Sequence, residues 1–432
     1  MNFKLTTTKA FQFFHISKQL AVIGIAILLS KSGVDGAVIG NYEMLFFLMF
    51  AFTFFWVSGS LQGLLTQYPK LSENTQQQLL FQFFLFFTLM SGVIVLLLFF
   101  GQEQLVPVFT KRATLDHYTI FLVFLFFNIP TFLVEHIYLL QERAKGIVAF
   151  AAFSFGLQVI AVILPLYLGY DIDVSFLALV ILSIIKYGWL LIVLIPTARI
   201  SWQLQPLFDT LKIAFPLILY ALIGGFAQVF DSWLVNWYYE GAPEQFAIFR
   251  YGARELPLAL AVAAAFSSSM LPKLVQQPDE SITEIYTKSR LLFHLLFPLA
   301  IIAALFSEWL FPIILSPAFQ ESYAVFNVYL LILINRLLFP HTILISLKEN
   351  QFIFYVSVIE LLLNIVSSIL LVQYFGMVGI AMGTVIAYSF EKIAHASFLK
   401  IRYEIGFHQY VDTKWWLAYS SVLLVVVAWS LI

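Results

Sequence analysis

The chain alternates between long apolar stretches and short polar segments. A bilayer core about 30 Å thick is crossed by about 20 apolar residues in an α-helix. Measured against that length, the pattern predicts thirteen membrane-spanning helices. They cover residues 11–30, 42–66, 77–100, 118–140, 147–168, 173–196, 208–238, 246–271, 287–314, 323–346, 352–374, 378–401 and 414–432. We interpret the first stretch as a retained helix rather than a signal peptide, because no small-residue cleavage site follows it. The pattern therefore predicts an all-α polytopic membrane protein.

Positive charge is distributed unevenly over the connections. If the N-terminus is placed in the cytoplasm, fifteen Lys and Arg residues fall in inward segments, and only Lys31, Lys111 and Arg112 fall in outward ones. Cytoplasmic connections of membrane proteins are enriched in Lys and Arg. The distribution therefore predicts a multi-pass protein with a cytoplasmic N-terminus and membrane lipids around it.

The composition excludes several classes of function. Hydrophobic residues make up 61% and charged residues 11% of the 432, whereas a soluble domain carries about 25% charged residues. The formal net charge of −1 argues against a nucleic-acid partner. Cysteine is absent, which excludes disulfides and thiol catalysis. The sequence also lacks a phosphate-binding loop, a nucleophile elbow and a zinc-protease helix, so we do not expect an enzyme.

Two segments suggest an internal repeat. The segment from Gly33 ends on Pro69-Lys70-Leu71, and the segment from Gly241 ends on Pro272-Lys273-Leu274. Similarly, Tyr167-Leu168-Gly169 has a counterpart in Tyr374-Phe375-Gly376. The repeat predicts two six-helix lobes, residues 1–200 and 201–402, related by a pseudo-two-fold axis along the membrane normal. Residues 403–432 would add one further helix.

The seventh predicted helix has features of a hinge. It is long, and it contains Pro216 and the pair Gly224-Gly225. Proline removes a backbone hydrogen bond and paired glycines weaken a helix. We expect either a bend that changes during transport or a static kink.

The stretch from Phe215 to Pro272 resembles a known family. It contains Asp231-Ser232-Trp233, the run Phe246-Ala247-Ile248-Phe249-Arg250-Tyr251-Gly252-Ala253-Arg254-Glu255-Leu256-Pro257, and Leu271-Pro272. With Gly33 and Gly40-Asn41-Tyr42 near the start, these residues resemble the O-antigen and capsule (Wzx-type) flippases. That family belongs to the multidrug/oligosaccharidyl-lipid/polysaccharide exporter superfamily.

The resemblance implies a fold, a cargo and a location. The fold would have twelve core helices in two lobes around a cationic cavity. The cargo would be an oligosaccharide repeat on undecaprenyl diphosphate, flipped by alternating access from the inner to the outer leaflet of the bacterial cytoplasmic (inner) membrane for O-antigen, capsule or exopolysaccharide assembly. Polysaccharide polymerase machinery would be a partner. The extra C-terminal helix departs from the family pattern.

Five cations fall inside predicted helices: Lys186, Arg250, Arg254, Arg336 and Lys392. A charged side chain at the bilayer centre costs about 2.5–3.5 kcal/mol on insertion scales, so each needs a partner, water or a function. We hypothesise that they bind an anionic diphosphate, which suits guanidinium groups. The alternatives are a clip between Asp231 and one of the two arginines near residue 250, and lysines that reach towards the membrane surface. Adjacent helix residues point about 100° apart, so we do not expect Lys392 to pair with its neighbour.

Acidic and amide side chains in the same helices are candidates for coupling transport to Na⁺ or H⁺: Asp231, Glu255, Glu360, Asn364 and Glu391. Glu360 and Asn364 share a helix face, and the fold would bring Asp231 near Thr384. Oxygen ligands of this kind suit Na⁺, and an isolated carboxylate suits H⁺. Glu135-His136 is either a proton relay or a hydrated pair. His15, His294, His341 and His395 are scattered along the chain, so we expect no metal site and no other cofactor.

Two other functions compete with the flippase. A cation-coupled multidrug antiporter has the same fold, but its cavity should be acidic or aromatic, because many drugs are cations. A membrane polysaccharide polymerase or ligase would need a large outward loop with catalytic groups. Here the longest predicted outward loop runs only from Gly101 to His117.

Overall fold

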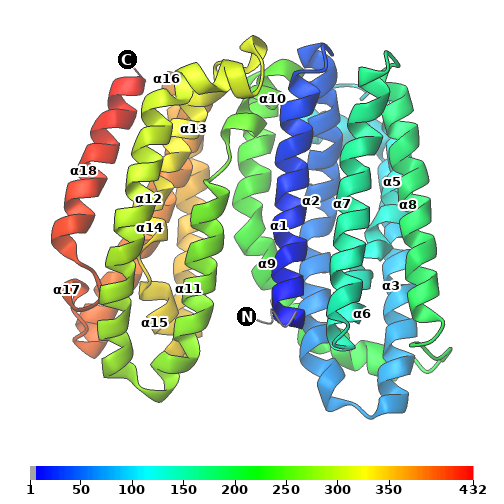
Figure 1. Ribbon diagram of the computed structural model, residues 1–432, viewed down its shortest axis with the longest axis horizontal. Helices are drawn as coiled ribbons and strands as arrows, with labels where there is room; N and C mark the ends of the chain where they lie inside the picture. The colour runs from blue at the N-terminus through cyan, green and yellow to red at the C-terminus, as the bar shows by residue number, and fades with distance from the viewer. Residues whose placement is uncertain (1–5, 432) are drawn as a thin grey trace. The chain divides into compact units, whose positions relative to one another are not determined.

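The computed structural model describes residues 6–431; residues 1–5 and Ile432, which belong to the first predicted lobe and the last predicted helix, lie outside the described residues. Within 6–431 every regular element is helical, which confirms the all-α fold (Figure 1). The helices are α1 (Thr7–Ser30), α2 (Gly36–Gln67), α3 (Glu73–Phe100), α4 (Gln102–Thr110), α5 (Tyr118–Asn128), α6 (Val134–Leu140), α7 (Ala144–Tyr167), α8 (Ile172–Leu194), α9 (Gln205–Tyr238), α10 (Pro243–Gly252), α11 (Pro257–Gln276), α12 (Pro278–Ile314), α13 (Ser322–Leu330), α14 (Ile332–Arg336), α15 (Pro340–Ser346), α16 (Asn350–Tyr403), α17 (Phe407–Tyr410) and α18 (Thr413–Ser430), with short 3-10 turns at Tyr68–Lys70, Ile129–Leu133 and Pro317–Phe319.

Each of the thirteen predicted segments overlaps helical residues within 6–431. Among the described residues, nine helices are long and apolar enough to cross a membrane, and a tenth candidate is the pair Ser322–Arg336 and Pro340–Ser346, bent by 43°. The helix α16 contains two of the predicted segments. The helices α11 and α18 are not among the nine membrane-crossing candidates. The chain is therefore polytopic.

The chain forms two compact units. Unit 1 holds the described residues up to Gly225 together with Glu240–Glu244, and unit 2 holds Phe226–Tyr239 and the residues from Gln245 onward. The boundary lies inside α9, directly after the predicted hinge pair Gly224-Gly225.

Unit 1 is a bundle in which α1 packs against α7, and α8 contacts both α5 and α7 (Figure 1). Two glycines of α2, Gly59 and Gly63, allow α9 to approach closely. A Cβ atom on Gly59 would lie 2.5 Å from Cα of Ile218, and one on Gly63 would lie 2.5 Å from Cβ of Ala214. Small residues four apart are a common way to bring membrane helices together. This spacing fixes the part of α9 that belongs to unit 1.

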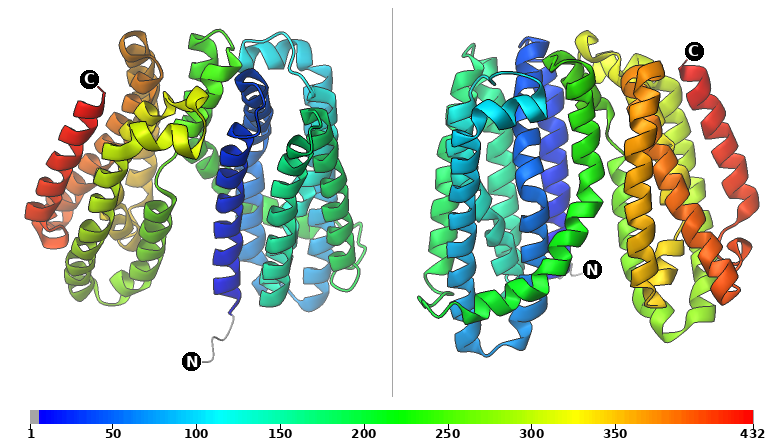
Figure 2. Two further views of the ribbon diagram at one scale, coloured as in Figure 1. Left: turned by 45° about the horizontal axis from the view of Figure 1, so that its top comes forward. Right: turned by 180° about the vertical axis from the view of Figure 1, so that it is seen from behind.

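Unit 2 is a second bundle, in which α12 packs against α18 and α11 contacts both α12 and α15 (Figure 2). The helix α16 turns back on itself at Gly376, whose φ of +56° and ψ of −138° are not helical. Glycine adopts positive φ at little cost because it lacks a Cβ atom. The hydroxyl of Tyr239 accepts a 3.1 Å hydrogen bond from the backbone N–H of Met377 at this turn, and burial raises the pKa of the tyrosine. The two arms of α16 correspond to the predicted helices 352–374 and 378–401.

The glycines that suggested an internal repeat all have positive φ values. Positive φ values occur at Gly33 (79°) and its counterpart Gly241 (73°), and at Gly169 (85°) and its counterpart Gly376 (56°). Glycine takes such values without the steric penalty that other residues meet. Each of these four positions is thus one at which glycine is favoured over other residues.

The predicted helix 246–271 is wrong in one respect, because it is broken. The helix α10 ends at Gly252 and α11 begins at Pro257, so Arg254 and Glu255 lie in the break between them. Proline disfavours the α conformation in the preceding residue, and Leu256 accordingly has a ψ of 113°. Arg250 and Arg254 therefore do not share one helix face.

Candidate functional site

A cluster of oxygen-bearing side chains lies inside unit 2. Oδ2 of Asp231, on α9, accepts a 2.7 Å hydrogen bond from the hydroxyl of Thr384 and a 3.3 Å bond from the hydroxyl of Tyr329 on α13. Asn364 donates through Nδ2 to the Thr384 hydroxyl at 3.1 Å. Asn364 and Thr384 lie on the two arms of α16, so the cluster joins three helices.

The glycines of α16 explain how its two arms reach each other. A Cβ atom on Gly379 would lie 2.2 Å from the carbonyl oxygen of Leu371, and one on Gly383 would lie 2.2 Å from Oγ of Ser368. Only glycine permits this backbone approach. Thr384 follows Gly383 directly, so the contact brings its hydroxyl to Asn364.

Two oxygen atoms of this cluster have no hydrogen-bond donor. Asp231 is 3% exposed and Asn364 is 2% exposed. Among residues 6–431, Oδ1 of Asp231 and Oδ1 of Asn364 are buried and lack a partner. Leaving a buried acceptor unsatisfied costs about 1–3 kcal/mol, and a bound ion is one way in which a native protein satisfies such atoms. A carboxylate, an amide oxygen and a hydroxyl are ligands that suit a hard cation.

The predicted coupling residues divide into two groups. Asp231 and Asn364 lie in this cluster with Thr384, as the sequence suggested for Asp231 and Thr384. Glu360 lies one helical turn before Asn364. Glu255 and Glu391 belong instead to a set of ion pairs. Tyr329 was missed, because nothing in the apolar segment around it distinguishes it from other buried tyrosines.

The ion pairs hold two of the predicted cations. Arg336 forms a two-pronged salt bridge with Glu255, in which Nε lies 3.0 Å from Oε2 and Nη2 contacts Oε1. The ring of Tyr388 lies under both cations, 4.7 Å from Cζ of Arg336 and 4.6 Å from Nζ of Lys392. Arg336 thus finds its partner on another segment of the chain.

The expectation that Lys392 does not pair with Glu391 is wrong. Nζ of Lys392 lies 2.7 Å from Oε2 of Glu391, and both side chains are 7% exposed. Their Cα–Cβ bonds diverge, but both side chains are long and flexible enough to meet beyond the helix surface. Burial favours the pair, because an isolated charge in a low-dielectric interior is far more costly.

Lys186 has a different environment in unit 1. Its Nζ donates a 2.8 Å hydrogen bond to Oδ1 of Asn128, on α5, and the side chain is buried. No carboxylate of residues 6–431 lies within ion-pair distance of it. Nearby on α6, Nδ1 of His136 lies 2.9 Å from the carbonyl oxygen of Phe132 and 3.6 Å from the buried carboxylate of Glu135.

Arg250 and Arg254 lie at the end of α10 and in the break after it. Nε of Arg254 donates to the backbone carbonyl of Arg250 at 3.3 Å, and its guanidinium lies 5.5 Å from the ring centre of Tyr251. The sequence also suggested a clip between Asp231 and Arg250 or Arg254. The hydrogen bonds to Asp231 described above come from hydroxyl groups, those of Tyr329 and Thr384, and not from a guanidinium group.

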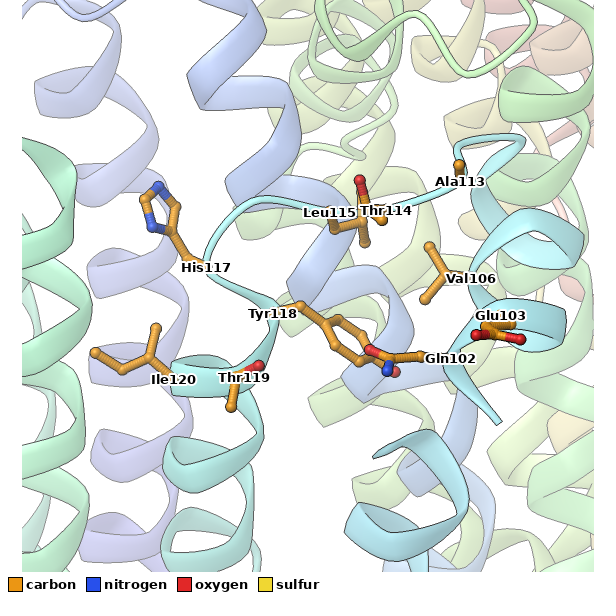
Figure 3. A pocket seen from close by; sticks show the side chains of 10 residues that line it. All are labelled: Gln102, Glu103, Val106, Ala113, Thr114, Leu115, His117, Tyr118, Thr119 and Ile120. Atoms are coloured by element: carbon orange, nitrogen blue, oxygen red, sulfur yellow. The ribbon is translucent and has the colours of Figure 1, made fainter. Parts of the chain in front are cut away.

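Unit 1 also carries a pocket of about 430 Å³ between α4 and the start of α5. Figure 3 shows the side chains around it, including Gln102, Glu103, Thr114, His117 and Tyr118. Nδ1 of His117 lies 2.7 Å from Asp173. The imidazole of His117 therefore already has a partner in Asp173. We assign no function to this pocket.

The histidines are less scattered than the sequence indicated. The rings of His341 and His395 lie 5.3 Å apart, with Glu391 beside both. They are 54 residues apart in the sequence, so no local spacing could reveal this contact.

Comparison with known proteins supplies the fold. No protein-family model and no curated protein match the sequence. Among solved structures, the lipid II flippase MurJ in an inward closed conformation matches with a TM-score of 0.69 and 15% identity over 97% of each chain. A superfamily transporter from Pyrococcus furiosus, described as having a binding pocket of reversed polarity, gives 0.62 and 12% over 97% of each chain. An outward-facing multidrug (MATE) transporter gives 0.61 and 13%, again over 97% of each chain.

At these identities the likeness concerns the fold alone. The solved structures belong to transporters and flippases of one superfamily, whose folds have two lobes. The chain has this fold along nearly its whole length.

Proposed function

We propose that the protein flips an undecaprenyl-diphosphate-linked oligosaccharide repeat unit from the inner to the outer leaflet of the bacterial inner membrane by alternating access. The product would feed O-antigen, capsule or exopolysaccharide assembly and its polymerase. The observation that carries the proposal is the buried ammonium group of Lys186, which bonds to the neutral amide of Asn128. The buried carboxylate of Glu135 interacts with this ammonium group electrostatically but forms no direct ion pair with it. A buried cation that is not directly paired is suited to an anionic head group.

The other predicted cations contribute in different ways. Arg336 and Lys392 are balanced by Glu255 and Glu391 in this structure. They would act on the cargo only in a state where these pairs open. Arg250 lies near the end of α10 and Arg254 lies in the break after it. Their guanidinium groups suit a diphosphate, which accepts paired hydrogen bonds.

We further propose that Na⁺ drives the cycle through the Asp231 cluster. Asp231, Asn364 and Thr384 would hold the ion, which would supply a positive charge that neutralises the buried carboxylate. The two donor-free oxygens support this role. The protein's own contribution is to join α9 to both arms of α16, so that ion binding favours the arrangement in which these helices meet.

The direct test is genetic. Deletion of the gene should cause lipid-linked repeats to accumulate on the inner leaflet, and the intact gene should reverse the accumulation. A strain that shows no accumulation but greater drug sensitivity would overturn the flippase proposal.

A multidrug antiporter remains the second candidate, because MATE transporters match almost as well as the lipid II flippase. The Asp231 cluster favours ion-coupled transport of either kind. Lys186 distinguishes them, since a buried cation repels a cationic drug. We propose transport rather than catalysis for both candidates.

A further inference from the structure

Three potential metal ligands converge in unit 2, away from the Asp231 cluster. Nδ1 of His341, on α15, lies 3.4 Å from Oε1 of Glu391, and Nδ1 of His395 lies 3.6 Å from the same oxygen. One ligand atom of each residue lies within 4.8 Å of the other two. In a tetrahedral site with bonds of about 2.0–2.2 Å, neighbouring ligand atoms are about 3.3–3.6 Å apart. Two of the three separations already match that geometry.

The state of His395 independently indicates a ligand. Its side chain is fully buried, and neither ring nitrogen has a hydrogen-bond partner among residues 6–431. A buried imidazole normally satisfies at least one nitrogen. One nitrogen of His395 faces Oε1 of Glu391, at a distance longer than a hydrogen bond. Metal coordination would satisfy this nitrogen.

Lys392 orients the carboxylate for this role. Its ammonium group lies 2.7 Å from Oε2 of Glu391, which leaves Oε1 towards the two imidazoles. Partners outside the ligand shell commonly fix metal ligands in this way. The ammonium also repels a cation held by charge alone. The site should therefore prefer metals that bond strongly to imidazole nitrogen over Mg²⁺ or Ca²⁺.

We propose that His341, Glu391 and His395 bind a divalent transition-metal ion, with Zn²⁺ the best chemical fit. Two imidazoles and one carboxylate form a known zinc ligand set that leaves a fourth position open. The ion would fasten α15, which follows the break in the bent helix pair, to the second arm of α16. The internal repeat separates Lys186 from Lys392 by 206 residues. The positions 206 residues before the three ligands hold Glu135, Ile185 and Trp189, so the first half of the chain has no equivalent ligand set.

Co²⁺ binding tests the proposal directly. The full-length protein, purified in detergent through an affinity tag without histidine, would be titrated with Co²⁺ and followed by visible absorption. We expect an intense d–d band typical of tetrahedral Co²⁺, which one equivalent of Zn²⁺ removes and excess Mg²⁺ does not. Absence of this band in the wild-type protein overturns the proposal.

Two substitutions separate the site from other histidines. His341→Gln and His395→Gln should each weaken Co²⁺ binding by more than about 100-fold, because loss of an outer-shell partner alone costs about 10–100-fold. The exposed residue His408 provides the control, and His408→Gln should bind like the wild type. Because His341 is 26% exposed, its variant is expected to fold even if a change at His395 is not tolerated. Equal binding by His341→Gln and wild type overturns the assignment. The measurement does not involve transport, so it stands apart from the proposed function.

Discussion

The hydroxyl of Thr384 donates a 2.7 Å hydrogen bond to Oδ2 of Asp231, a residue 153 positions earlier in the chain. The same hydroxyl accepts a hydrogen bond from Asn364. Asp231 and Asn364 each keep one buried oxygen without a hydrogen-bond partner among residues 6–431. The cluster thus contains a carboxylate oxygen and an amide oxygen beside the hydroxyl of Thr384.

Removing the charge of this cluster should abolish its response to Na⁺. We expect Asp231→Asn to weaken Na⁺-dependent transport by more than about tenfold, because it removes the one carboxylate of the proposed ligand set. Transport can be measured as the rate at which lipid-linked repeats leave the inner leaflet in vesicles with and without a Na⁺ gradient. Ser307→Ala on α12 is the control, since its buried hydroxyl bonds to the backbone of its own helix, away from the cluster. Equal Na⁺ stimulation of Asp231→Asn and wild type would contradict the coupling proposal.

Lys186 should matter for cargo more than for stability. Lys186→Met keeps an unbranched side chain of similar length, and Asn128 loses one hydrogen bond, worth about 1 kcal/mol. We expect a near-normal amount of protein in the membrane and a loss of transport of at least about tenfold, equivalent to 1.4 kcal/mol. Complementation of the deletion strain, with the protein level measured by immunoblot, tests this. Lys145→Met, at an exposed position of α7, should complement fully. Full activity of Lys186→Met would remove the main support for an anionic cargo.

The Glu255–Arg336 pair should contribute to stability. The two side chains are 26% and 23% exposed. Exposed pairs contribute about 0–1 kcal/mol, and breaking a buried pair costs about 3–5 kcal/mol. We therefore expect Glu255→Gln to destabilise the protein by about 1–3 kcal/mol, between these limits.

A double substitution isolates this interaction. Glu255→Gln combined with Arg336→Met should be more stable than the sum of the two single changes implies, because no unpaired charge remains. Thermal unfolding in detergent measures all three variants. Breaking the Lys212–Asp209 pair, whose side chains are 76% and 57% exposed, with Asp209→Asn serves as the control and should leave the midpoint nearly unchanged. Strict additivity of the two changes would show that the pair is energetically silent.

The sequence predicted what depends on local pattern. The positions of the helices follow from apolar length, and the turn of α16 at Gly376 follows from a glycine between two apolar stretches. The break around Arg254 could have been predicted from Gly252 and Pro257, but the continuous apolar character of the segment concealed it.

Contacts between residues far apart in the chain were harder to predict from the sequence. The pairing of Asp231 with Thr384 was anticipated only through the family resemblance. The proximity of His341 to His395 depends on how α15 packs beside α16, which periodicity does not specify. Lys392 and Glu391 show the reverse problem, because they are neighbours in sequence whose contact depends on side-chain rotamers rather than on helix geometry. The metal and ion-pair clusters therefore became visible only in three dimensions.

The close packing of α2 on α9 gives the sharpest test of the fold. Gly59→Ala places a methyl group 2.5 Å from Cα of Ile218, a backbone atom that cannot move independently of its helix. Overpacking of this kind costs about 1–3 kcal/mol, so the unfolding midpoint in detergent should fall. Gly156→Ala is the matched control, because nothing lies within 4 Å of the added methyl group on α7. There, replacing glycine inside a helix should leave stability unchanged or raise it by up to about 1 kcal/mol. If the two alanine variants unfold at the same temperature, α2 and α9 do not pack at the distance described.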